Sequence, residues 1–220
     1  KVFGSEWPRI NDAWRAIAAY QRTLVSDAKK VPADRYAMGD KKALNDSQKR
    51  GFALYNGKAN CIACHNGPLA SNQQFYATGV PDHPQFKDDP IGQVTHRWEW
   101  YQKGVTESDY RNARGDAGLY YMTMNPKDIG KWRVPSLREL KYTGPYMHNG
   151  MLASLGDVVE FYNQGGGEAQ NKTKLLKPLK LSPQEKKDLV AFLEALSMDE
   201  PLLQDDPRLP GDYQPLTAAK

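Results

Sequence analysis

Cysteine and histidine are scarce in this sequence, and long apolar runs are missing. The 220 residues include two cysteines and four histidines, which allows one disulfide at most. No apolar run approaches the length of a membrane span, which needs about 20 residues. The mean hydropathy is −0.73. We therefore expect a water-soluble chain without a membrane span. No signal peptide is found at Lys1, so we expect a mature chain or a fragment.

Both cysteines lie in one five-residue run, Cys61–His65, which reads C-x-x-C-H. This spacing is the attachment signature of c-type haem. It places two thiols on one side of a tight helical turn, where each can form a thioether, and the following histidine beneath the iron. A thioredoxin-like dithiol and half of a zinc site are the alternatives. The dithiol needs a βαβ context that is missing, and the other histidines, His83, His96 and His148, are scattered. The motif predicts one covalent haem c with His65 as proximal ligand.

The charge and the motif together indicate which partners and which compartment to expect. The net charge is +4 and the pI about 8.9. A mildly basic surface suits acidic redox partners, although most such charge is simply solvated. We expect no nucleic-acid partner. Covalent c-type attachment is completed outside the cytoplasm in bacteria, so we expect a periplasmic protein.

The periodicity predicts an all-α domain spanning 1–220. Its elements are a long N-terminal helix at 6–26, a cytochrome c-like haem core at 45–197 and an extended tail at 198–220. We expect the first helix to begin after Ser5 and to bury Trp7 and Trp14. The segment 31–42 is expected to be a loop. The segment 66–132 has no long period, and we expect an irregular excursion whose aromatic side chains pack against haem or loop.

The haem core is predicted to contain three capped helices. Asn45 with Gln48, Ser154 with Asp157, and Ser182 with Glu185 have the spacing of capping boxes. The first helix should end at Gly57, just before the haem motif, and the second at the glycines that begin at Gly165. An amphipathic helix followed at once by C-x-x-C-H is the usual start of a cytochrome c domain.

Several segments resemble the bacterial dihaem cytochrome c peroxidase and MauG family, in order along the chain. They are Ala18–Leu24, Cys61–Pro68, Arg133–Arg138, Tyr142–Gly150 and Phe161–Gly166. The match runs from Trp7 to Ser197 and corresponds to the second haem domain of that family. Family members carry a first domain with its own C-x-x-C-H and the haem that reacts with peroxide, whereas this chain has one motif.

The resemblance implies electron transfer in a peroxidase or MauG-like system. This domain would hold one haem, and a second domain or subunit would carry the haem where peroxide or oxygen reacts. Small redox proteins, such as a cytochrome c or a cupredoxin, are the implied partners. Two alternatives stay open: a plain monohaem electron carrier, and a chain whose own haem is catalytic.

The resemblance also bears on the sixth iron ligand. In the family this ligand comes from the helix after the P-Y-x-H-x-G motif, as methionine in peroxidases and tyrosine in MauG. Counting from His148, the position falls on Tyr162, at the end of a capped helix. An ordinary tyrosine at a helix end is the alternative role for this residue. The other candidate ligands are Met122, Met124, Met147 and His148.

Five further residues are implied around the haem. His148 is expected among its surroundings, through a propionate or a backbone hydrogen bond. Arg133 and Arg138 could pair with propionates, because guanidinium matches carboxylate bidentately, or could form ordinary ion pairs. The family binds calcium between its two domains through carbonyl oxygens that match Thr143 and Pro145. Without the first domain that calcium site would be incomplete.

Overall fold

The computed structural model describes residues 9–84, 90–108 and 116–202, and the described part is mostly helical. Short 3-10 turns connect the helices at Cys61–Ala63, Pro126–Asp128 and Leu140–Tyr142. The only sheet among the described residues is an antiparallel pair of two-residue strands. Its strands are β1 (Phe75–Tyr76) and β2 (Trp132–Arg133). The all-α prediction is confirmed at this level.

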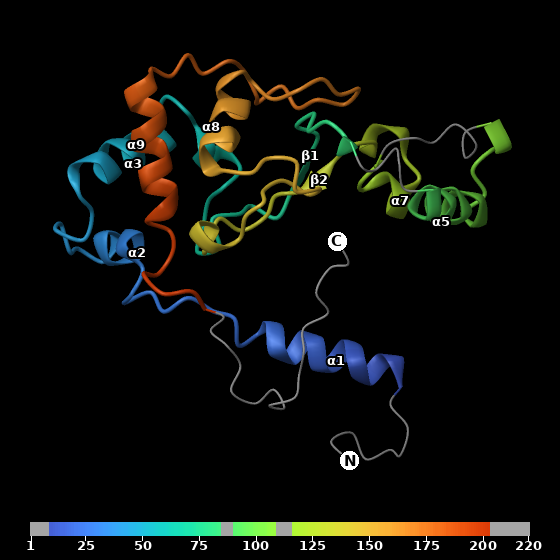
Figure 1. Ribbon diagram of the computed structural model, residues 1–220, viewed down its shortest axis with the longest axis horizontal. Coiled ribbons are helices and arrows are strands. Elements are labelled where there is room, and N and C mark those ends of the chain that lie inside the picture. Colours follow the sequence, from blue (N-terminus) through green and yellow to red (C-terminus); the bar gives the residue numbers. More distant parts are fainter. Residues whose placement is uncertain (1–8, 85–89, 109–115, 203–220) are drawn as a thin grey trace.

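The core lies where α3 (Asp46–Asn56) crosses α9 (Pro183–Glu194), with α8 (Leu155–Asn163) against α9 (Figure 1). All three predicted capping boxes are present, with both hydrogen bonds of each pair. Each box satisfies N–H groups that a helix start leaves unpaired. The buried core consists of apolar side chains, mainly Leu44, Tyr55, Leu155, Val159, Leu181, Leu189, Phe192, Leu193 and Leu196.

A glycine permits the close crossing of α3 and α9. A Cβ atom at Gly51 would lie 2.0 Å from the carbonyl oxygen of Asp188. The same Asp188 is 2% exposed and accepts hydrogen bonds from Ser47, Arg50 and Gln184. The hydrogen bonds from Arg50 hold the pKa of the Asp188 carboxyl far below its usual range. A buried carboxylate is tolerated here because it is fully hydrogen-bonded.

The N-terminal helix differs from its prediction. Helix α1 spans Ile10–Gln21, because the chain turns after Arg22 and both the amide and the hydroxyl of Thr23 bond to the Tyr20 carbonyl. Trp14 is 61% exposed, so the expected burial is wrong for this tryptophan. The predicted cap Ser5 and Trp7 lie outside the described residues.

Two segments expected to be irregular contain helices. Helix α2 (Pro32–Ala37) uses Pro32 in its first turn, where a missing N–H costs nothing. Helix α5 (Pro90–Gln102) lies within the predicted excursion, and its Trp100 packs on Tyr120 and Tyr121 at α7 (Tyr120–Thr123). Aromatic packing within the excursion is thus confirmed. The prediction of an irregular segment is wrong for α5. The aromatic residues of this helix do not follow a simple helical period, so the sequence did not indicate it.

The described residues contain no helix long and apolar enough to cross a membrane. Of the tail predicted to be extended, residues 198–202 are described and belong to no helix or strand. The remainder lies outside the described residues.

Candidate haem site

The haem motif sits on a tight turn directly after α3. The helix ends at Asn56 with Gly57 as its C-cap, as predicted, and Asn60 adopts a positive φ of 50° that redirects the chain. The turn Cys61–Ala63 follows, and the amides of Cys64 and His65 both bond to the Cys61 carbonyl, at 3.2 and 2.9 Å. The two thiols and the imidazole are therefore presented by a single helical turn.

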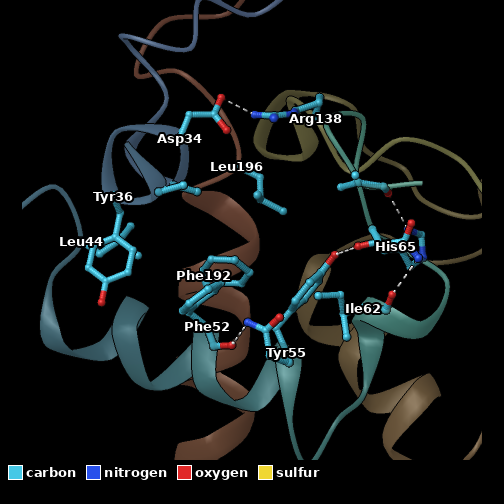
Figure 2. A pocket seen from close by; sticks show the side chains of 16 residues that line it. Asp34, Tyr36, Leu44, Phe52, Tyr55, Ile62, His65, Arg138, Phe192 and Leu196 are labelled. Atoms are coloured by element: carbon cyan, nitrogen blue, oxygen red, sulfur yellow. Dashed lines mark hydrogen bonds and ion pairs between the residues drawn. The ribbon is translucent and has the colours of Figure 1, made fainter. Parts of the chain in front are cut away.

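The ring of His65 is oriented by backbone. Its Nδ1 lies 3.0 Å from the carbonyl oxygen of Ala70, which only accepts, so Nδ1 carries the proton. The carbonyl of Pro135 also bonds to the ring. In the neutral ring one nitrogen keeps its lone pair. The hydroxyl of Tyr55 donates to the His65 carbonyl (Figure 2). Burial lowers the pKa of His65. A neutral imidazole with its other nitrogen bonded to a carbonyl is the usual form of a metal-ligating histidine.

The two cysteines have the wrong chemistry for a redox dithiol. Burial raises the pKa of Cys61 to about 11 and that of Cys64 above its ordinary value. A reactive dithiol needs the opposite shift. Among the described residues, no group of three His, Cys, Asp or Glu is able to hold a metal ion.

Tyr162 is brought to the same site by α8. Its pKa is raised to about 12, first by burial and then by the charges of Cys61 and Cys64. The end of α8 is fixed by Asn163, whose carbonyl and side-chain oxygens accept from the amides of Leu179 and Leu181 at 2.9 and 2.8 Å. The assignment of Tyr162 as the sixth ligand, counted from His148, stays a prediction.

The donor set fits haem c. Cys61 and Cys64 supply two thiols that their raised pKa values keep protonated, His65 supplies an oriented ring, and Tyr162 stands next to the last residue of α8. These four residues would hold the group.

The other candidate ligands lie in different surroundings. The ring of His148 stacks on Trp132, with centroids 3.9 Å apart, and burial lowers its pKa against the opposing charges of Asp116 and Asp82. Met122 is 81% exposed. Met124 and Met147 have positive φ values in turns.

The two arginines make contacts within the protein. Arg138 bonds to Asp34 at 2.6 Å through Nη1 (Figure 2). It also donates to the Pro68 carbonyl through Nε and Nη2, at 2.9 and 2.7 Å. Arg133 donates to Gln73 at 3.0 Å. For Arg138 the structure therefore gives the ion pair that the sequence left open. A propionate contact of either arginine stays a prediction.

Thr143 and Pro145 lie in an exposed turn after the 3-10 helix Leu140–Tyr142. The turn is anchored by Tyr142, whose hydroxyl bonds to the Met198 carbonyl at 3.1 Å. Calcium binding at these two carbonyls stays a prediction.

Sequence reasoning missed several groups that support the site. Ala70 takes a positive φ of 48°, and this conformation, which nothing in the residue type signals, aims its carbonyl at His65. The hydroxyl of Tyr76 bonds to the Cys64 thiol. A cavity of about 180 Å³ lies behind the motif, lined by α2, α3, Arg138 and the end of α9 (Figure 2).

No family model matches the chain. Individual proteins do. The chain is 69% identical over 217 residues to a protein of Pseudomonas sp. (strain SCT) named cytochrome-c peroxidase IdrP1, covering 99% of this chain and 57% of that protein. It is 36% identical over 210 residues to the methylamine utilization protein MauG of Methylorubrum extorquens, covering 95% of this chain and 50% of that protein. The chain is a homologue of cytochrome c peroxidases and of MauG.

The fold comparison agrees with the sequence. A crystal structure of a MauG-like protein associated with microbial copper homeostasis superposes with a TM-score of 0.60 at 28% identity, over 80% of this chain and 50% of that one. The family prediction is therefore confirmed. The chain spans about half the length of the relatives that it matches. Its assignment to their second haem domain stays a prediction.

Proposed function

We propose that the chain is the electron-transfer haem domain of a cytochrome c peroxidase or MauG-like oxidoreductase. Peroxide or oxygen would react at a second haem, on another domain or subunit. The observation that carries this proposal is the Cys61–His65 turn, which presents two thiols and a ring oriented by the Ala70 carbonyl. Similarity to cytochrome c peroxidases and MauG supports it, over about half their length.

Haem c, when bound, supplies an iron centre that exchanges single electrons. His65, through a ring nitrogen, and Tyr162, through its hydroxyl oxygen, would hold the group. Because burial raises the pKa of Tyr162 to about 12, its hydroxyl holds its proton in the protein alone. Ligation requires this proton to leave, and ferric charge favours the anion. An oxygen donor then favours ferric iron and a low potential, whereas a thioether would favour ferrous iron.

A basic surface near Tyr162 suits an acidic electron donor such as a small cytochrome c or cupredoxin. Lys174, Lys177 and Lys180 are exposed on the segment that ends against Asn163 of α8. Lys186 is not counted with these three lysines, because its side chain pairs with Glu160 at 2.8 Å. We propose that this basic segment is the docking side and that the protein works in the periplasm.

Peroxide turnover separates the proposal from its competitors. The haem-loaded chain alone should not oxidise a reduced donor with hydrogen peroxide, because the reacting haem is elsewhere. Turnover by the chain alone would make its own haem catalytic and contradict the proposal. A plain carrier is distinguished by potential: Tyr162→Met should raise the midpoint potential if the natural ligand is a phenolate. An unchanged potential in this variant would show that Tyr162 is not the ligand, whereas a plain carrier is recognised because it has no stable partner that carries a second haem.

A further inference from the structure

The two cysteines of the haem motif are held in different ways. Cys61 packs against the buried core of α3, α8 and α9, and its thiol donates weakly to the Ala59 carbonyl, at 3.9 Å. Cys64 is less deeply buried, and its thiol has a polar partner in the hydroxyl of Tyr76 on β1. A packed side chain is positioned by its neighbours, whereas a less covered one can change rotamer unless a hydrogen bond holds it.

Tyr76 itself is fixed by the strand pair. Opposite it on β2 lies Trp132, whose ring stacks on that of His148 with centroids 3.9 Å apart. The next residue, Ala77, is fully buried and forms a bridge with Lys172. The backbone at Tyr76 is thus held on both sides, so its side chain can locate a group on another segment.

Asn72 connects Tyr76 to the motif. Its backbone amide donates to the Cys64 carbonyl at 2.8 Å, and its side-chain amide donates to the Ala63 carbonyl at 3.4 Å and to the Tyr76 hydroxyl at 3.2 Å. Because the hydroxyl oxygen accepts from Asn72, the hydroxyl proton is available for the sulfur of Cys64. Cys64 is therefore held at its carbonyl by Asn72 and at its thiol by Tyr76.

We propose that Tyr76 is the positioning residue for thioether formation at Cys64. In this reaction the sulfur bonds to the vinyl carbon next to the haem ring and the thiol proton passes to the outer vinyl carbon, so no electron is gained or lost. Sulfur and vinyl group must meet in one orientation, and holding a reactant in place contributes strongly to rate. Tyr76 provides that hold, and Asn72 keeps the Tyr76 hydroxyl in place. The inference rests on the proposed function only in requiring that the chain binds haem c.

Attachment in the full chain tests the inference. The chain and its Tyr76→Phe variant are produced in a bacterial periplasm with the haem-attachment machinery, then unfolded, treated with a thiol-alkylating reagent and mapped by peptide mass spectrometry. The share of chains with an alkylated Cys64 should rise about tenfold in the variant, because a reactant that is not held loses rate steeply. Cys61 should stay attached, because packing positions it. Asn72→Ala should give the same selective defect at Cys64.

A control variant and a spectrum separate positioning from a general loss of structure. Tyr142→Phe removes a hydroxyl that bonds to the Met198 carbonyl at 3.1 Å, and it should leave both thioethers complete. In reduced pyridine solution the absorption band of the Tyr76→Phe product should shift to longer wavelength, because one vinyl group stays conjugated with the ring. Complete attachment in both Tyr76→Phe and Asn72→Ala would overturn the inference, as would equal failure at the two cysteines. A chain without substitution that carries no covalent haem would refute the proposed function as well.

Discussion

At the scale of single residues, the site depends on backbone groups that hold side chains in place. Ala70 and the Pro68 carbonyl belong to the loop after the haem motif, and Arg138 clamps that loop to Asp34. Charged hydrogen bonds of this kind contribute more than neutral ones. The clamp therefore links α2 to the loop that orients His65.

Substituting Arg138 distinguishes a clamp from a propionate ligand. Arg138→Gln should lower the free energy of unfolding by about 1 to 3 kcal/mol, because bonds to a charged group are lost. The midpoint potential should change little, because the guanidinium is engaged by Asp34 and Pro68. Thermal unfolding and redox titration of the same variant check both parts. A large potential shift at unchanged stability would show that Arg138 acts on the haem.

At the scale of elements, the crossing of α3 and α9 depends on Gly51. Gly51→Ala should lower the free energy of unfolding by at least about 2 kcal/mol, because the added methyl group meets the Asp188 carbonyl. Gly156→Ala on α8 is the matched control, since its Cβ would meet only the Ser154 hydroxyl, at 3.5 Å. The control should be neutral or slightly stabilising. Denaturant titration measures both, and equal stability of the two variants would refute the close crossing.

The Asp188 carboxylate at this crossing makes the free energy of unfolding depend on pH. The pKa of Asp188 is lowered mainly by its hydrogen bonds with Arg50, so its contribution is complete above the unfolded pKa of about 4. That contribution is lost as pH falls toward the folded pKa. Asp188→Asn should therefore be less stable at neutral pH and should show a shallower loss between about pH 4 and pH 2. Unfolding at several pH values tests this, and parallel curves would exclude Asp188 as the cause.

The sequence predicted those elements whose signals are local. Capping boxes at Asn45, Ser154 and Ser182 and the stop at Gly57 follow from neighbouring residues, and the structure confirms them. Helix α5 and the exposure of Trp14 depend on tertiary contacts, and sequence periodicity does not report these. At the candidate site, the sequence predicted Cys61, Cys64 and His65 because the attachment motif has a fixed spacing. The sequence could not predict the role of Ala70, because the residue acts through its backbone carbonyl rather than through its side chain.

At the scale of the whole molecule, charge determines how the chain meets its donors. Electron transfer from an acidic donor should slow as salt rises, because exposed charges are screened over about 10 Å at 0.1 M. Lys177→Gln with Lys180→Gln should reduce both the rate at low salt and its salt dependence. Lys29→Gln with Lys30→Gln, also exposed, is the control pair. Rates that ignore salt would leave the basic segment as solvated surface.

The chemistry of the molecule depends on which atom completes the iron coordination. We propose that this atom is the hydroxyl oxygen of Tyr162. The direct measurement is the ferric absorption and paramagnetic resonance spectrum of the haem-loaded chain against Tyr162→Phe. Tyr146→Phe is the control, since Tyr146 bonds to the Leu140 carbonyl at 2.8 Å. Tyr162→Phe should change the ferric spectrum as the position opens or takes water, while Tyr146→Phe should not. If Tyr162→Phe leaves the ferric spectrum and potential unchanged, the sixth ligand is another residue and the proposed role of Tyr162 is wrong.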